Sequence, residues 1–325
     1  MKQFLISGLV DEYRVKIKIF ASSPSIAIKI FQQKYPKAKD VFVIDNAYHG
    51  HTNSLIDLSP YKFDGKGGLG KKKYVHILEM PDPLRGKWQY KNKDWIKKYI
   101  NEAKEKINNQ SKINKLSCLF VESILGCGGQ FILPKNYLKE VFKEVRKNKA
   151  LCIVDEVQTG FGRVGNNFWS FQEHQVIPDI VTLGKPMGNG HPIAAVVTTE
   201  NIASSFNNGM EYFNSFGGNP VSCAVGKSVL EVIENKKLQE NALSVGKYFL
   251  NKLERIKRKN TKYISEVRGR GLFIGIDIIE NSNQLKPNKQ LAKKIINFMR
   301  NNGILLSTDG PYDNVIKIKP PLVFN

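Results

Sequence analysis

The stretches IVDEVQTGFGR (153–163) and IVTLGKPMGNG (180–190) give the strongest signal for the fold. Each opens with a short apolar run, typical of a buried strand, and continues into a polar or glycine-rich loop. Asp155 stands at the carboxyl end of the first run, and Lys185 follows the second. Ligands of open α/β sheets bind at the carboxyl ends of the strands. The two stretches therefore predict a site that contains a carboxylate and an amine.

Further buried strands are expected at VFVID (41–45) and LSCLFVES (116–123), and a helical pattern at 134–148 precedes the strand at 150–157. Strands that alternate with helices favour an α/β fold with a mostly parallel, covered sheet. From Asn219 onward, helices and strands interleave again and suggest a second, smaller α+β domain. The expected divisions are an atypical strand and helix at 1–38, a large domain at 39–244 and a small C-terminal domain at 245–325.

The composition is that of an ordinary globular protein with a large positive charge. The chain has 325 residues, 41% of them hydrophobic, and a formal net charge of +21. The charge comes from lysines spread along the sequence, and no motif combines basic and aromatic residues, so we expect no nucleic-acid partner. No apolar run approaches the roughly 20 residues of a membrane span, and no signal-peptide pattern is present. We expect a cytoplasmic protein without a membrane partner.

The positions of cysteine and histidine argue against disulfides and metals. The four cysteines are far apart, with no C-x-x-C pair. His49 and His51 have a spacing that two metal ligands could use. No third or fourth ligand stands near them in the sequence, so we expect no metal site.

Four segments together resemble one enzyme family. They are YHGHT (48–52), DEVQTGFGR (155–163), LGKPMGNG (183–190) and NSFGGNPVSCA (214–224). In this order they resemble the class III aminotransferases, which are pyridoxal-phosphate enzymes of fold type I, and the resemblance extends from about Asp40 to the end of the chain. It implies a fold type I large domain with a smaller C-terminal α+β domain, a small amine as substrate, and a homodimer.

The resemblance also implies roles for individual residues. Lys185 would form the Schiff base with pyridoxal phosphate, and Asp155 would keep the ring nitrogen protonated. Gln158 would reach the 3-oxygen of the ring, and Tyr48 would stack on its face. Glu122 stands where the family has an acidic residue near the cofactor.

Ser215 matches a hydroxyl residue that reaches the cofactor phosphate of the partner subunit. In the family this contact crosses the dimer interface. Ser215 is therefore expected to bind the cofactor of the second chain rather than that of its own.

Two departures from the family pattern concern the substrate. Members that act on ω-amino acids have a glutamate where ESILGCGGQ (122–130) has Cys127, and an arginine where IKIKPPL (316–322) has Lys317. Both changes resemble the phospho-lyase branch of the family, which includes ethanolamine-phosphate phospho-lyase and the phosphohydroxylysine enzyme. That branch eliminates phosphate and ammonia. Aminotransfer to a 2-oxo acid or aldehyde is the alternative reaction, and Cys127 and Lys317 are candidate substrate-binding residues in either case.

The N-terminal region departs most from the family. Members usually have a segment like SGSEAND, whose backbone amides hold the cofactor phosphate at a helix N-terminus. Here the alignment puts FASSPS (20–25) in its place, and Pro24 lacks an amide hydrogen. The family's N-terminal region and its extreme C-terminus are expected to be missing from this chain. A catalytically inactive fragment is therefore the second alternative.

Overall fold

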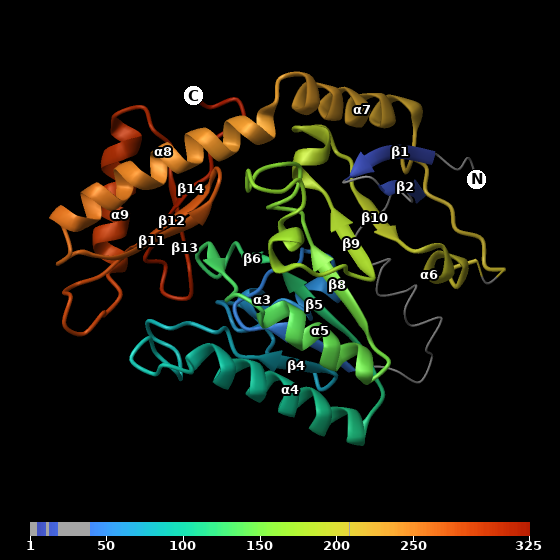
Figure 1. Cartoon of the computed structure of the whole chain (residues 1–325), viewed down its shortest axis with the longest axis horizontal. Helices are drawn as coiled ribbons and strands as arrows, with labels where there is room; N and C mark the ends of the chain where they lie inside the picture. Colours follow the sequence, from blue (N-terminus) through green and yellow to red (C-terminus); the bar gives the residue numbers. More distant parts are fainter. Residues whose placement is uncertain (1–4, 11–12, 19–39, 208) are drawn as a thin grey trace.

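The structure, a computed structural model, describes residues 5–10, 13–18, 40–207 and 209–325 (Figure 1). Its main feature is a six-stranded sheet with the order β10-β9-β8-β5-β3-β4. The strands from β9 to β4 are parallel, and β10 is antiparallel to β9. This confirms the mostly parallel α/β sheet predicted from the sequence. The strands span Asp40–Ile44 (β3), Val75–Leu78 (β4), Leu116–Glu122 (β5), Leu151–Asp155 (β8), Ile180–Leu183 (β9) and Ala195–Thr198 (β10).

Helices cover both faces of this sheet because its central strands are apolar on both sides. Leu119 and Val121 of β5 join a buried cluster with α4 (Trp95–Ile113) and α5 (Tyr137–Lys147). Phe120 of the same strand joins a second cluster with α2 (Asn53–Ile56), α3 (Pro60–Phe63) and α6 (Glu200–Ser204). Successive side chains of a strand point to opposite faces, so one apolar run serves both clusters.

A smaller antiparallel sheet follows in the C-terminal part, with the order β11-β12-β14-β13. Leu253 of α8 (Leu238–Lys259) and Ala292 of α9 (Lys289–Asn301) pack against Ile274 and Ile316 of this sheet. The second, smaller α+β unit predicted from the sequence is therefore present. Its strands span Ile264–Arg270 (β11), Phe273–Ile278 (β12), Ser307–Asp309 (β13) and Val315–Ile318 (β14).

Two helices connect the large sheet to the small one. α7 (Pro220–Asn235) begins after Asn219, whose side chain accepts a hydrogen bond from the amide of Ser222. Lys237 then adopts a left-handed conformation, with φ of 50°, and α8 starts at the next residue. The sequence pattern predicts one helical run here, and the left-handed residue divides it. The domain boundary predicted at residues 244 and 245 falls within α8, which leads from α7 to the small sheet (Figure 1).

The remaining elements are short. The hairpin of β1 (Leu5–Val10) and β2 (Tyr13–Lys18) lies beside β10 (Figure 1). The helix expected after residue 20 and the FASSPS segment lie outside the described residues. No helix in the described ranges is long and apolar enough to cross a membrane. The other short elements are β6 (Ile124–Leu125), β7 (Phe131–Ile132), and the 3-10 helices η1 (Ser170–His174) and η2 (Lys185–Gly188).

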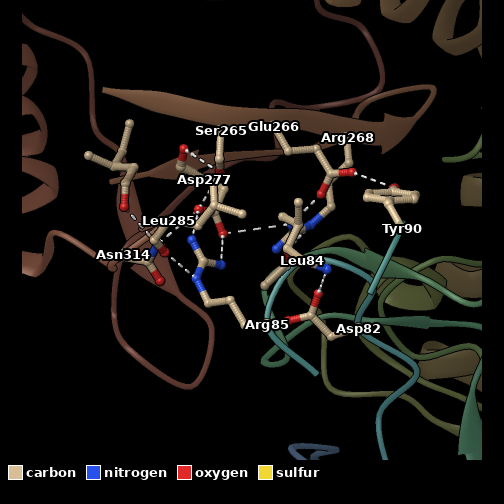
Figure 2. Close-up of polar contacts among 12 residues, drawn as sticks. Asp82, Leu84, Arg85, Tyr90, Ser265, Glu266, Arg268, Asp277, Leu285 and Asn314 are labelled. Carbon is tan, nitrogen blue, oxygen red and sulfur yellow. Dashed lines mark hydrogen bonds and ion pairs between the residues drawn. The ribbon is translucent and has the colours of Figure 1, made fainter. Parts of the chain in front are cut away.

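Two arginines join the small sheet to the large unit. Arg85, in the loop after β4, donates hydrogen bonds of 2.9 and 2.5 Å to the two carboxylate oxygens of Asp277 on β12 (Figure 2). Arg163, in the loop after β8, donates to the carbonyl oxygens of Leu272 and Pro320. The second arginine positions the residues that follow β14 beside the loop that follows β8.

Candidate active site

The carboxyl ends of the central strands bring the predicted site residues to one edge of the sheet. Glu122 ends β5 and is paired in register with Asp155, which ends β8. Asp155 is in turn paired with Thr182 of β9, and Lys185 opens η2 directly after that strand. The carboxylate and the amine predicted from the sequence therefore follow neighbouring strands at the same edge.

Asp155 is buried and bound by an imidazole. Its Oδ2 lies 3.1 Å from Nδ1 of His49, and its Oδ1 accepts a hydrogen bond of 3.0 Å from the amide of Val157. Because a carboxylate only accepts hydrogen bonds, Nδ1 carries the hydrogen. The His49 ring stacks on Phe120 with centroids 4.0 Å apart, and its Nε2 has no hydrogen-bond partner among the described residues. Sequence reasoning considered His49 only as a metal ligand and missed its contact with Asp155, because the two residues are 106 positions apart.

Glu122 is almost fully buried next to this pair. Its two oxygens accept hydrogen bonds from the amides of Tyr48, at 3.2 Å, and Gly126, at 3.1 Å. Burial and the charge of the neighbouring Asp155 raise the pKa of Glu122, whereas His49 and the two amides lower it. The net result of these effects is a pKa of about 7. This carboxyl group therefore titrates near neutral pH.

Tyr48 and Gln158 lie close to the segment that runs from Glu122 to Gly126. Burial raises the pKa of the Tyr48 phenol, and the charges of Cys127 and Asp155 contribute to the shift. The side chain of Gln158 lies so close to Gly126 that a Cβ at that glycine would be 2.4 Å from Nε2. Glycine at 126 is therefore needed for Gln158 to occupy its place.

Cys127 lies among charged groups, which include Lys185. Burial raises the pKa of its thiol to about 12, with further increases from Glu122 and Asp309, and the charges of Lys317 and Lys185 oppose them. The thiol is thus uncharged at neutral pH. The two departures from the family pattern are close together, because the carbonyl of Cys127 accepts a hydrogen bond of 2.9 Å from the amide of Gly310, and the adjacent Asp309 binds Lys317.

The residues of and after β14 add two lysines. Lys317 Nζ lies 2.7 Å from Oδ2 of Asp309, which also accepts a hydrogen bond from Gln130. Lys319 Nζ lies 3.4 Å from Oε1 of Gln158. Sequence reasoning did not single out Lys319. The alternation of isoleucine and lysine in IKIK (316–319) could have identified Lys319, because it puts Lys317 and Lys319 on the same side of an extended chain.

Ser215 is separate from this group within one chain. It is exposed, between Phe213 and Phe216, which are 78% and 83% exposed. No hydrogen bond joins Ser215 to another predicted site residue in the described part of the chain. Its predicted contact with the cofactor of a partner subunit remains a prediction.

The donor set at this edge fits pyridoxal phosphate. Asp155 is a carboxylate anchored by an imidazole and an amide, as a partner for a protonated ring nitrogen requires. Lys185 supplies an exposed primary amine, and Tyr48 and Gln158 supply an aromatic ring and an amide. The segment predicted to hold the cofactor phosphate lies outside the described residues.

Relatives of similar sequence include proteins named as aminotransferases and as phospho-lyases. The chain is 44% identical over 299 residues to an alanine–glyoxylate aminotransferase 2-like protein of Drosophila melanogaster, and this alignment covers 90% of the chain and 60% of the relative. It is 42% identical to an ethanolamine-phosphate phospho-lyase homolog of Caenorhabditis elegans, covering 90% of the chain and 65% of the relative. The chain thus spans about three fifths of the length of these curated relatives.

A solved structure has the same fold over nearly the whole chain. It is a phospholyase from Arthrobacter in complex with phosphoethanolamine, with a TM-score of 0.87 and 36% identity over 95% of this chain and 73% of that one. The family model for class III aminotransferases matches residues 21–325. The chain therefore belongs to the class III aminotransferases, a family of pyridoxal-phosphate-dependent enzymes.

Proposed function

We propose that this protein is a phospho-lyase that eliminates phosphate and ammonia from a small phosphorylated amino alcohol such as phosphoethanolamine. The observation that carries the proposal is the close placement of Cys127 and Lys317, which bind the adjacent residues Gly310 and Asp309. An uncharged thiol and an ammonium group replace the carboxylate and the guanidinium expected in ω-amino acid aminotransferases, so this exchange removes one negative charge. Such a pocket favours an anionic substrate group, and the solved phospholyase contains phosphoethanolamine.

The residues have distinct tasks in this reaction. Lys185 Nζ would hold the cofactor, Asp155 would face its ring nitrogen, and Tyr48 and Gln158 would contact the ring. Pyridoxal phosphate, when bound, draws electrons from the substrate carbon that carries the amine. The hydrogen bond of 3.1 Å from His49 fixes the orientation of the Asp155 carboxylate.

Lys185 moves the proton that starts the elimination. Its Nζ takes the proton from the carbon that carries the amine. The bond between the neighbouring carbon and the phosphate oxygen then breaks, and the electron pair leaves with the phosphate. With one water, phosphoethanolamine yields acetaldehyde, ammonia and phosphate. Aminotransfer would instead return a proton to the cofactor and keep the phosphate ester intact.

We further propose that the protein acts as a homodimer. Ser215 lies in an exposed segment with Phe213 and Phe216, and such exposed aromatic side chains commonly mark an interface. In the dimer, Ser215 would serve the site of the partner subunit.

The proposed function predicts a cofactor fixed on one lysine and phosphate release from phosphoethanolamine. The protein is loaded with pyridoxal phosphate, reduced with borohydride and digested, and we expect peptide mapping to find the cofactor on Lys185. Lys185→Ala should lose phosphate release by a factor of at least about 10³, because it removes the amine proposed to hold the cofactor and to take the proton.

Lys97→Ala is the matched control, since Lys97 is an exposed lysine of α4, and α4 contains none of the predicted site residues. Label spread over many lysines would contradict the Lys185 assignment. Transfer of the amino group to 2-oxoglutarate without phosphate release would favour the aminotransferase. A wild-type protein that binds no cofactor would favour the inactive fragment.

A further inference from the structure

We infer that Lys319, rather than Lys317, is the residue that recognises the phosphate group of the substrate, an inference that rests on the proposed function. Both lysines come from the end of β14, on the same side of the chain. They differ in what already binds them.

Lys317 is engaged within the protein. Its Nζ forms an ion pair of 2.7 Å with Asp309, whose carboxylate is 9% exposed. Gln130 donates a second hydrogen bond, of 2.9 Å, to the same oxygen of Asp309. An anion that bound Lys317 would have to compete with this nearby carboxylate, so the charge of Lys317 is largely compensated before any substrate arrives.

Lys319 has only a neutral polar partner. Within the described residues its Nζ donates to the amide oxygen of Gln158, at the long distance of 3.4 Å. Its ammonium group also lies over the ring of Phe273, 5.5 Å from the centroid. Neither partner neutralises the charge of Lys319. The ammonium group has three N–H donors, and these contacts leave donors available for a stronger acceptor.

The surroundings of Lys319 are rich in positive charge. Arg163 donates to the carbonyl of Pro320, the residue that follows Lys319, and also to the carbonyl of Leu272. Burial lowers the pKa of Lys319, the charges of Arg163, Lys185 and Lys317 act in the same direction, and the charge of Asp309 opposes them. The net result is a pKa of about 7. A bound dianion would relieve this repulsion and keep Lys319 protonated.

The position of Lys319 suits a substrate group rather than a distant anion. Gln158, its partner, is proposed to contact the cofactor ring, and the charge of Lys185 acts on Lys319. An anion on Lys319 would therefore lie next to Gln158, the proposed contact of the cofactor ring. The residue acts as a determinant of substrate specificity, and Lys185 performs the chemistry.

The test measures binding of two matched amines without any elimination. The loaded protein is titrated with 2-aminoethylphosphonate and with propylamine, which has a methyl group in place of the phosphonate, and the absorption of the bound cofactor reports occupancy. We expect the wild type to prefer the phosphonate. Lys319→Gln should reduce this preference about 10- to 100-fold, because one charge-assisted hydrogen bond is lost, and should leave the affinity for propylamine within about twofold.

Three further variants make the result specific. Lys319→Arg keeps the charge and should retain most of the preference even if Lys319→Gln holds the cofactor poorly. Lys317→Gln should reduce the preference less than Lys319→Gln. Lys294→Gln removes an exposed lysine of α9 from the same unit and should retain the wild-type preference.

Two results would overturn the inference. One is an equal loss of affinity for both amines in Lys319→Gln, which would assign the residue to the cofactor. The other is a larger loss in Lys317→Gln than in Lys319→Gln. Phosphate release from phosphoethanolamine is measured separately on the wild type. Its absence, with a preference that still depends on Lys319, would overturn the proposed elimination and leave the anion site in place.

Discussion

At the scale of single residues, the site contains a buried acid whose protonation should affect stability. The pKa of Glu122 is about 7 in the folded chain because burial disfavours its charged form. In the unfolded chain the pKa of a glutamate is about 4.3. The folded state therefore binds this proton more tightly. The stabilisation is fully present below the unfolded pKa and is lost as the pH rises through about 7.

We predict that the free energy of unfolding of the cofactor-free protein decreases between pH 5 and pH 8, in part because Glu122 must ionise. The contribution of this group should be about 2–3 kcal/mol. Glu122→Gln removes it and should flatten the dependence by about that amount. Guanidinium denaturation at the two pH values measures the difference.

Glu231→Gln serves as the control, because Glu231 is an exposed residue of α7 that forms a surface ion pair with Lys227. This variant should keep the wild-type decrease. If Glu122→Gln also keeps it, the amides of Tyr48 and Gly126 hold the Glu122 carboxylate ionised in spite of its burial.

At the scale of elements, two glycines in consecutive helices differ in what surrounds them. Gly246 lies in α8 against the small unit, and a Cβ there would be 2.3 Å from the carbonyl oxygen of Gly271. Gly226 lies in α7, where a Cβ would find its nearest neighbour, a methyl group of Ile193, at 3.4 Å. Alanine is the better helix former at both positions, so packing decides the outcome.

We predict opposite effects for the same substitution. Gly246→Ala should destabilise the protein by about 2 kcal/mol or more, because backbone atoms of the neighbouring turn would have to move. Gly226→Ala should stabilise it by about 0.5–1 kcal/mol. Thermal or chemical denaturation of the two variants under one condition tests this. A gain in stability for both would mean that α8 can move away from Gly271 at little cost.

The sequence predicts the elements of the large sheet well and those of the site in part. Apolar runs locate β3, β5, β8 and β9, because strands covered on both faces need continuous apolar residues. The break between α7 and α8 was not predictable, since it depends on the left-handed conformation of Lys237, an ordinary helix former. The sequence motifs predicted that Asp155 and Lys185 lie at the same edge of the large sheet, where its strands end. They did not reveal His49 or Lys319, whose partners are 106 and 161 residues away.

At the scale of the whole molecule, the ion pair of Arg85 with the buried Asp277 joins the two units. Arg85 binds both carboxylate oxygens of Asp277, which also accepts hydrogen bonds from Ser265 and Asn314 (Figure 2). The side chain of Asp277 is 1% exposed. Removing the guanidinium would leave a buried carboxylate without its main partner.

We predict that Arg85→Met destabilises the protein by about 3–5 kcal/mol. Asp277→Asn should cost less in the Arg85→Met background than in the wild type, by about 2 kcal/mol, because the unpaired charge is then absent. A double-mutant cycle by denaturation measures this coupling.

Lys87→Ala is the control on the same loop. Lys87 forms an ion pair with Glu102 and is 53% exposed, so its loss should cost less than about 1 kcal/mol. If Arg85→Met costs no more than Lys87→Ala, water enters between the two units and solvates Asp277.

The position of β14 has a consequence for how the chain acquires its structure over time. β14 is the last strand in the sequence, yet it lies inside the small sheet, between β12 and β13. During synthesis the other three strands emerge first, and β12 keeps an open edge until β14 arrives. Pairing between segments far apart in sequence is slow. Because Lys317 and Lys319 arrive with that strand, a nascent chain gains the lysines of the proposed anion site only when the small sheet closes, and it is prone to aggregation until then.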